Sequence, residues 1–455
     1  MKLFPPEPKV DLYNEGFGAD DFLNRKPTGK ALSDLVERIE DPLVIVLDGP
    51  WGSGKSYFLT RWVGAHTIEN SGEATTVYFD AFANDFLDDP LTGLAGAVNE
   101  RLPDNTDPKA RRLFKGAIAK LRKPVVRTGM AALTAGLSEM SGPIVDAMIS
   151  AGGSHLEQAV DDFWKREDGK REAMKEVERS LLSITQGANG LHANKLVIVI
   201  DELDRCRPDY ALAVLETIKH FFAVSNVHFI LGVNMVALEH SVRARYGNDI
   251  DAEGYLRRFI SLTTRFPIPK PQTDDRTDAR TYWLRQGRLM GLPSNLLENV
   301  DRQLALRGRP GVATIRDINR LLSLAALMPG GKEFNGMGAG YQIVIGSMLV
   351  ARALQPSFFE KMRSRRVTVN DIRSFYGITD EQTDENSSRS GQYNQAAVML
   401  IAFWQFLSSP ENAQVDEQIA RSFDGFSLRP REIDLDQLAR EHFDTFALVR
   451  GGQDE

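Results

Sequence analysis

The sequence has little of what stabilises secreted proteins or carries a chain across a membrane. Its 455 residues include a single cysteine, Cys206, so neither an internal disulfide nor a cysteine-based zinc cluster can form. The first residues have no apolar run of signal-peptide length, and no stretch offers the roughly 20 predominantly apolar residues of a transmembrane helix. We therefore expect a cytoplasmic protein without a transmembrane segment. Its three most apolar stretches are predicted to be buried helices: Thr128–Gly153, Phe334–Ala351 and Ser390–Pro410.

An excess of positive charge is also absent. There are 55 Lys and Arg residues against 62 Asp and Glu residues, a net charge of −7, so attraction to a polyanion requires a local patch. One such patch is Lys109–Arg127, which holds eight basic residues, no acidic one, and apolar residues on the opposite helical face. Two interpretations stay open: a solvated amphipathic surface helix, or a contact with nucleic-acid phosphates or lipid headgroups.

Short apolar, β-branched runs alternate with helical patterns in the first two thirds of the chain. This alternation predicts an α/β fold with a mostly parallel sheet that helices cover on both faces. A short helix is predicted over Asp34–Ile39. From Asp278 onward the apolar positions recur at helical spacing with no convincing strand, which predicts an all-helical C-terminal region. The predicted strands are Leu43–Leu47, Thr75–Phe79, Lys195–Ile200 and His228–Val233.

A proline-rich segment divides these two parts. Pro267-Ile-Pro-Lys-Pro271 can continue neither a helix nor a sheet, so we predict an α/β core over residues 1–270 and a helical domain over residues 271–455. More than a hundred residues separate the second and third strands, too many for one crossover connection. A helical insertion is therefore predicted at about residues 105–190.

The strongest functional signal is Gly49-Pro-Trp-Gly-Ser-Gly-Lys-Ser, which lies between the first strand and a helix and matches a phosphate-binding loop. Gly52 and Gly54 let the backbone wrap around an anion, and the helix that starts at Ser56 adds its positive end. Lys55 is predicted to neutralise β- and γ-phosphate oxygens, and Ser56 to bind Mg²⁺. The predicted nucleotide-binding residues are Gly49, Trp51, Gly52, Ser53, Gly54, Lys55, Ser56 and Tyr57.

A second signal is the pair of acids that ends the third strand. Asp201 and Glu202 should lie at the carboxyl edge of the sheet, beside the phosphate loop, where open α/β sheets bind ligands. Asp201 is predicted to hold Mg²⁺, and Glu202 to orient and deprotonate the attacking water. No Asn/Thr-Lys-x-Asp guanine-recognition motif follows a late strand, so ATP is the expected nucleotide.

Together, these motifs resemble the KAP family of P-loop NTPases over roughly Asp20–Arg320. The resemblance rests on the tryptophan in the phosphate loop and on the runs Tyr78-Phe-Asp-Ala-Phe82, Ile200-Asp-Glu-Leu-Asp-Arg-Cys-Arg-Pro208, Leu215–Phe222, Phe229–Asn234 and Tyr255–Ile260. It implies an AAA-like P-loop core of the additional-strand type, a helical lid, and an insertion that contains membrane helices in many members. The insertion here is too polar to span a membrane, which implies a soluble member.

The resemblance also suggests further site residues. Asn234 stands where many members have Asp, and it is expected to hydrogen-bond the γ-phosphate or water without acting as an acid. Phe82 stands at the position where the family pattern has a tryptophan-like residue. It keeps an aromatic side chain beside the site but lacks the indole N–H donor. Arg258 and Arg316 are candidates for stabilising charge in the transition state, with ordinary surface salt bridges as the alternative for both.

The function expected from these residues is Mg²⁺-dependent ATP hydrolysis that drives a conformational switch. Prokaryotic family members that this chain resembles are associated with defence against phages and plasmids, which implies partner proteins encoded nearby. Two alternatives stay open: a signalling scaffold gated by slow nucleotide turnover, and an ATPase stimulated by nucleic acid bound at Lys109–Arg127. A homo-oligomer is equally compatible with the sequence.

Overall fold

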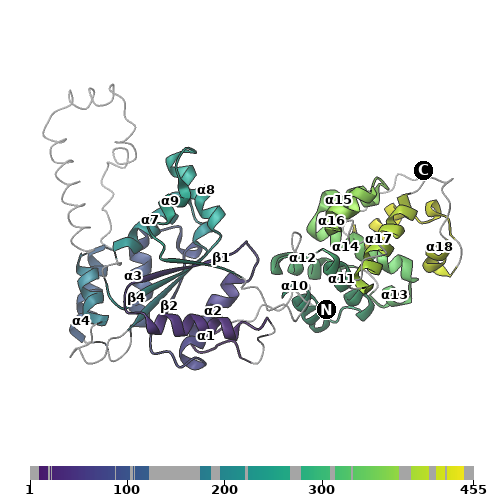
Figure 1. Cartoon of the computed structure of the whole chain (residues 1–455). Coiled ribbons are helices and arrows are strands. Elements are labelled where there is room, and N and C mark those ends of the chain that lie inside the picture. The colour runs from purple at the N-terminus through teal and green to yellow at the C-terminus, as the bar shows by residue number, and fades with distance from the viewer. Residues whose placement is uncertain are drawn as a thin grey trace, which may run out of the picture.

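The computed structural model describes two helix-rich regions, one that ends at residue 266 and one that begins at residue 278 (Figure 1). Only the first region contains strands among the described residues. The described residues are 10–18, 21, 23–87, 89–102, 106, 108–121, 175–185, 195–220, 224–266, 278–307, 313–328, 331–378, 391–408, 417–425 and 428–444.

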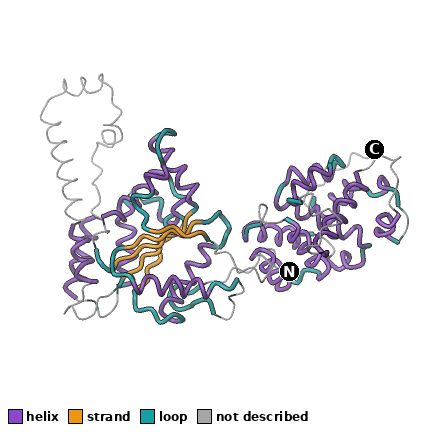
Figure 2. Tube along the Cα trace, in the orientation of Figure 1, coloured by secondary structure: helices purple, strands orange, loops and turns teal. Residues whose placement is uncertain are grey.

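A five-stranded parallel sheet forms the centre of the first region, with helices on both faces (Figure 2). Its order is β2-β3-β4-β1-β5, and the strands are β1 (Leu43–Asp48), β2 (Thr75–Asp80), β3 (Leu196–Asp201), β4 (Val227–Val233) and β5 (Leu262–Arg265). The four predicted strands are confirmed. β4 lies between β3 and β1, as expected for the additional-strand type. The sequence did not predict β5, because Leu-Thr-Thr-Arg is polar and mostly exposed at the sheet edge.

Alternate side chains of each central strand pack into two different apolar cores, one on each face of the sheet. Because both faces are buried, most positions of these strands are apolar, and the sequence shows an almost continuous apolar run. In β1, Val44 and Val46 join one core, while Ile45 and Leu47 join the other. The helices of this region are α1 (Lys26–Arg38), α2 (Lys55–Ile68), η1 (Phe82–Asn84), α3 (Pro90–Arg101), α4 (Pro108–Leu121), η2 (Leu203–Arg205), α7 (Pro208–His220), α8 (Met235–Tyr246) and α9 (Ala252–Leu256), and residues 175–185 are also helical.

Helix α1 corrects the predicted helix at Asp34–Ile39. It begins earlier, at Lys26, with a proline in its first turn, and it ends at Arg38 with Ile39 as the C-cap. The prediction began too late because the first turns are polar and expose little of the apolar periodicity that marks a helix. Leu32 and Val36 nevertheless anchor α1 in the same core as α2.

The predicted insertion is described only in part. Its residues 108–121 and 175–185 are helical, while 122–174 and 186–194, and with them Thr128–Gly153, lie outside the described residues. Within the basic stretch, α4 buries Phe114, Ala117 and Ile118 in the core that also contains β2 residues. The amphipathic character predicted for this stretch is therefore present as far as Ile118, the last residue of α4 whose side chain is described.

Every element of regular secondary structure described in the second region is a helix. One apolar core unites residues from Ala279 to Phe443, and α14 (Ala339–Leu354) lies at its centre. The predicted stretch Phe334–Ala351 falls in α13 (Gly331–Gly336) and α14, and Ser390–Pro410 contains α17 (Gly391–Ser408). Within the described part of the chain, no helix has both the length and the apolar character to cross a membrane. The helices are α10 (Asp278–Leu289), α11 (Ser294–Leu306), α12 (Ile315–Leu327), α13 (Gly331–Gly336), α14 (Ala339–Leu354), α15 (Pro356–Arg363), α16 (Val369–Tyr376), α17 (Gly391–Ser408), α18 (Glu417–Asp424), η5 (Pro430–Glu432) and α19 (Leu435–His442).

Candidate functional site

The loop between β1 and α2 has a backbone that glycine makes possible. Gly52 has φ 82° and Gly54 has φ 90°, in the left-handed region that residues with a side chain rarely adopt. Gly49 is required for space, because a Cβ there would lie 2.2 Å from the carbonyl oxygen of Phe266. Gly54 also precedes the first turn of α2, whose N–H groups are available to an anion at the loop.

The amine of Lys55 is held inside this loop. Its Nζ donates hydrogen bonds to the carbonyl oxygens of Gly49 (2.5 Å) and Pro50 (3.2 Å), and the residue is buried. Burial lowers the pKa of Lys55, and the nearby carboxylates of Asp204 and Asp201 oppose that shift. A buried ammonium whose partners are two carbonyl oxygens has its positive charge available to an incoming phosphate.

A hydroxyl in the same loop has no partner. Ser53 is 8% exposed, and its Oγ has no hydrogen-bond partner among the described residues. Buried polar atoms are nearly always hydrogen-bonded, so an unpartnered one in a glycine-rich loop indicates a ligand site. Together with Lys55 and the two left-handed glycines, Ser53 makes the loop fit a phosphate group.

The third strand delivers Asp201 to the same edge of the sheet. β4 separates β3 from β1, and Gly232 of β4 leaves the space between them free: a Cβ there would lie 2.8 Å from Asp201 Oδ1 and 2.4 Å from Leu59 Cδ1 of α2. The lack of a side chain at Gly232 therefore lets Asp201 and α2 approach each other across the intervening strand.

Asp201 is almost completely buried, at 1% exposure. Its carboxylate accepts hydrogen bonds from the Tyr78 hydroxyl and from the backbone N–H of Glu202, both at 2.9 Å. Burial raises the pKa of Asp201 to about 6, although hydrogen bonds from Ser56 and Tyr78 favour the anion. A buried carboxylate beside a serine hydroxyl is a donor set that suits Mg²⁺, so Asp201 and Ser56 fit the predicted metal position.

Glu202 follows in a strained conformation. Its φ of 59° is left-handed, which is uncommon for a residue with a side chain and is typical of functional sites. Glu202 Oε1 lies 2.7 Å from Arg205 Nη1 and accepts a 3.4 Å hydrogen bond from the Ser56 hydroxyl. The Glu202 carboxylate thus faces the start of α2, beside the phosphate loop.

These groups line one cavity of about 280 Å³ at the carboxyl edge of the sheet. Arg316 reaches it from α12, and the backbone N–H of Ile315 donates a 2.8 Å hydrogen bond to the carbonyl oxygen of Gly52. Figure 1 shows α12 on the side of the helical region that faces the sheet. The lining residues are Trp51, Gly52, Ser53, Gly54, Lys55, Ser56, Tyr57, Asp201, Glu202, Asp204, Arg205, Gly232, Ile315, Arg316 and Asn319.

The structure brings together most of the predicted site residues, but it places four others outside the lining. Phe82 lies in η1 and is exposed. Gly49 contributes its carbonyl oxygen to Lys55. Asn234 is the N-cap of α8, where its Oδ1 accepts from the N–H of Ala237 at 3.4 Å. Arg258 is exposed in the turn after α9.

Sequence reasoning overlooked five lining residues: Asp204, Arg205, Gly232, Ile315 and Asn319. The first two lie in the same acidic run as Asp201, so their place in the motif was a usable signal. Asn319 lies three residues after Arg316 on α12, a spacing that puts both on one helix face. Its Oδ1 is buried without a hydrogen-bond partner among the described residues.

Comparison with solved structures gives only distant similarities. The Aeropyrum pernix ORC2 protein, solved as ADPNP–ADP complexes, is 12% identical, with 83% of this chain and 86% of that chain covered and a TM-score of 0.33. AMPPCP-bound DnaA from Aquifex aeolicus is 10% identical, with 92% and 88% covered and a TM-score of 0.30. Scores this low support no statement about the present chain.

Sequence comparison is more informative about the family. No curated protein matches the chain at significant similarity. The KAP family P-loop domain, in contrast, matches residues 25–321, which is well over half of the 455 residues. This segment contains the phosphate loop, Asp201 and Glu202 at the end of β3, and the start of α12. The chain belongs to the KAP family of P-loop NTPases.

Proposed function

We propose that the protein is a Mg²⁺-dependent ATPase that binds the phosphates of ATP between the α/β core and α12. The observation that carries this proposal is that one cavity contains the phosphate loop, Asp201 and Glu202 at the end of β3, and Arg316. Each of these groups comes from a different segment of the chain, and each has the chemistry that phosphoryl transfer requires.

Each residue has a distinct role in this proposal. Lys55 replaces its contacts with loop carbonyls by contacts with phosphate oxygens, and Ser56 and Asp201 hold Mg²⁺. The metal, when bound, neutralises charge that develops on the phosphates. Glu202 orients a water molecule and accepts its proton, and Arg316 stabilises negative charge from the side of α12.

The contact between Gly52 and Ile315 supports a switch function. A hydrogen bond of 2.8 Å joins the phosphate loop to the first residue of α12, so a change in the loop on nucleotide binding or hydrolysis acts directly on that helix. We propose that the helical domain, residues 271–455, moves as a lid in response. Asn234 joins the site only if its side chain leaves the α8 cap, and Arg258 only if the turn after α9 rearranges.

The biological role proposed for this ATPase is a part in a prokaryotic anti-phage or anti-plasmid complex in the cytoplasm, together with proteins encoded nearby. It rests on the family and on no residue of the site. Stimulation by nucleic acid is the second candidate, because α4 carries Lys109, Arg112 and Lys115 on exposed positions.

The test is ATP hydrolysis by the purified protein with Mg²⁺ and with excess EDTA. Hydrolysis that requires Mg²⁺ and is lost in Lys55→Ala supports the proposal, and equal turnover by wild type and Lys55→Ala contradicts it. Co-purified nucleotide with very slow release and turnover indicates the scaffold alternative. A rate increase with DNA or RNA that disappears at high salt indicates the nucleic-acid alternative.

A further inference from the structure

The exposed tryptophan of the phosphate loop makes one polar contact that crosses the site. Trp51 Nε1 donates a 2.5 Å hydrogen bond to Asp204 Oδ2, although the two residues are 153 positions apart in sequence. Trp51 is 46% exposed, whereas Asp204 is 7% exposed. Both residues line the cavity, so the bond joins the phosphate loop to the segment that follows β3.

That segment begins with Glu202. Asp204 is the middle residue of η2, which starts directly after Glu202. The left-handed backbone of Glu202 is unfavourable for a residue with a side chain, so it persists only where neighbouring contacts hold it. Leu203 is fully buried, and Arg205 pairs with the Glu202 carboxylate itself. The Trp51–Asp204 bond adds a fixed link to the phosphate loop.

We propose that Trp51 and Asp204 are positioning residues for Glu202. Their hydrogen bond fixes η2 against the phosphate loop and thereby sets where the Glu202 carboxylate lies relative to the γ-phosphate position. This inference rests on the proposed function, because it requires Glu202 to act on the attacking water. It assigns Trp51 a role in the rate of hydrolysis that is separate from the binding of ATP.

Asp204 also acts on Lys55 through its charge, so the two effects must be separated. Its carboxylate is the first of the groups that raise the pKa of Lys55 against burial. Trp51→Phe removes the hydrogen-bond donor and keeps the charge of Asp204. Asp204→Asn keeps an acceptor oxygen and removes the charge, and Asp204→Leu removes both.

The first experiment measures single-turnover hydrolysis and ATP affinity for these variants. A small misplacement of a catalytic group costs up to about 100-fold in rate, so Trp51→Phe should be slower by about ten- to a hundredfold. Its dissociation constant for Mg·ATP should change by no more than about threefold. Asp204→Asn should retain more of the wild-type rate than Asp204→Leu, because its amide oxygen still accepts from the indole.

The second experiment asks whether Trp51 acts through Glu202. If it does, Trp51→Phe should cause no further loss in a Glu202→Gln background, where the base is already absent. The matched control is Trp283→Phe in α10, which removes an indole N–H that donates to the Leu297 carbonyl oxygen at 3.0 Å. Its rate per folded molecule should equal that of the wild type.

The outcomes separate this inference from the proposed function. The positioning role is wrong if Trp51→Phe hydrolyses ATP at the wild-type rate, or if it slows Glu202→Gln as much as it slows the wild type. It is also wrong if Trp51→Phe loses rate only in proportion to lost ATP affinity. A wild type without Mg²⁺-dependent hydrolysis, or a Glu202→Gln variant with normal hydrolysis, overturns the proposed function and the positioning role together.

Discussion

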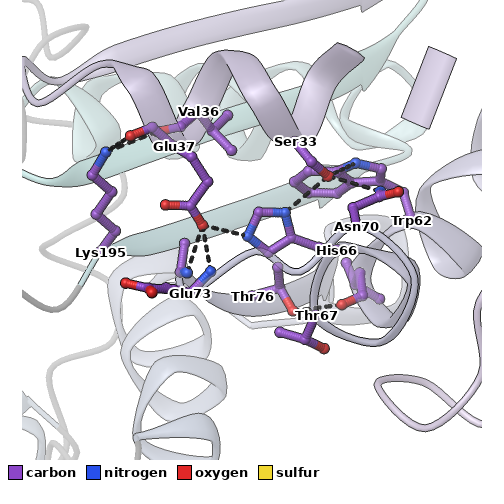
Figure 3. A network of polar contacts seen from close by, with 12 residues as sticks. Ser33, Val36, Glu37, Trp62, His66, Thr67, Asn70, Glu73, Thr76 and Lys195 are labelled. Atoms are coloured by element: carbon purple, nitrogen blue, oxygen red, sulfur yellow. Dashed lines mark hydrogen bonds and ion pairs between the residues drawn. The ribbon is translucent and has the colours of Figure 1, made fainter. Parts of the chain in front are cut away.

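The two ends of the parallel sheet carry polar networks of different kinds. At the end where the strands begin, His66 is fully buried between Ser33 Oγ (2.9 Å) and Glu37 Oε1 (3.0 Å), as Figure 3 shows. Glu37 Oε1 also accepts from the backbone N–H groups of Glu73 and Ala74, at 2.6 and 2.8 Å. This amino-end network closes on itself and joins α1 and α2 to the start of β2.

At the end where the strands finish, the polar groups are left open. The hydroxyl of Ser53 has no partner among the described residues, Glu202 has a left-handed backbone, and Trp51 is half exposed. Asn226 and His228, at the amino end, also have buried atoms that lack a partner in the described part of the chain, but neither residue lines the cavity. A satisfied network such as that of His66 stabilises a fold, while unsatisfied and strained groups beside a cavity are typical of a site that binds a ligand. The difference predicts that matched substitutions at the two ends affect different observables.

The largest contrast is expected between two lysines. Lys55→Ala should reduce Mg²⁺-dependent ATP turnover to background, because the phosphates lose their main counter-charge in the loop. Its thermal midpoint should stay close to wild type. Lys195→Ala at the other end, where the amine donates to carbonyl oxygens of Val36 and Glu37, should keep turnover and lower the midpoint. Loss of turnover in Lys195→Ala with normal turnover in Lys55→Ala would reverse the assignment of the two ends.

The next contrast concerns the two acidic residues of the candidate site, Asp201 and Glu202. Glu202→Gln should bind Mg·ATP and hydrolyse it roughly 10²–10⁴-fold more slowly, as expected for loss of a general base. Asp201→Asn should weaken Mg²⁺-dependent binding as well as turnover, because it alters a predicted metal ligand. Calorimetric nucleotide affinity with and without Mg²⁺, together with single-turnover rates, distinguishes the two.

The control for the acids is Glu37→Gln in the amino-end network. This variant should retain ATP turnover and lose about 1–3 kcal/mol of unfolding free energy, because the amide oxygen of Gln would accept the three hydrogen bonds of Glu37 Oε1 without the carboxylate charge that strengthens them. Identical nucleotide affinities for Glu202→Gln and Asp201→Asn would count against the division of roles between the two acids.

A smaller effect is expected at α12. Arg316→Ala should lower turnover by about tenfold and leave nucleotide binding nearly intact, because its side chain lines the cavity from the helical region. The matched control is Arg320→Ala, an exposed arginine one turn further along α12 that does not line the cavity. Equal rates for the two variants, or a loss of ATP binding in Arg316→Ala as large as in Lys55→Ala, would refute this role.

The sequence was sufficient to predict the features that depend on residues close together in the chain. The strands β1 to β4 and the phosphate loop follow from apolar runs and glycine spacing, which are short-range properties. The edge strand β5 was overlooked because a polar edge strand lacks that apolar signal. The role of Asn234 as the cap of α8 was available from sequence, since Asn directly before a helix is a preferred N-cap.

What the sequence could not predict are contacts between distant segments. The Trp51–Asp204 bond and the contact of Ile315 with Gly52 join residues more than 150 positions apart, and no periodic pattern encodes them. The amino-end network has the same property, because His66, Glu37 and Ser33 meet only when α1 packs on α2. Such contacts depend on the packing of whole elements, which local patterns do not fix.

The two ends should also respond in opposite directions to pH. Burial raises the pKa of Asp201 to about 6, above its ordinary value near 4. The ionisation of Asp201 therefore lowers the free energy of unfolding as the pH rises from about 4 to about 6. His228, at the start of β4, is fully buried, and burial lowers its pKa to about 4. The positive charge of Lys195 contributes to this shift, while the backbone of Ile39 and the negative charge of Glu37 oppose it.

The pH dependence of His228 can be isolated with the variant His228→Leu, which should leave ATP turnover at neutral pH unchanged. In the unfolded chain His228 takes up a proton near pH 6.5, whereas in the folded protein it stays neutral until the pH falls to about 4. The stability from neutral His228 is therefore complete above pH 6.5 and is lost as the pH falls from 6.5 to 4, by on the order of 3 kcal/mol. Urea unfolding at pH 7.5, 6 and 5 should show a flatter decline for His228→Leu than for the wild type. Parallel curves for the two proteins would mean that His228 is protonated equally in the folded and unfolded states. The decline that remains in the variant is expected to come from His66, whose pKa burial also lowers.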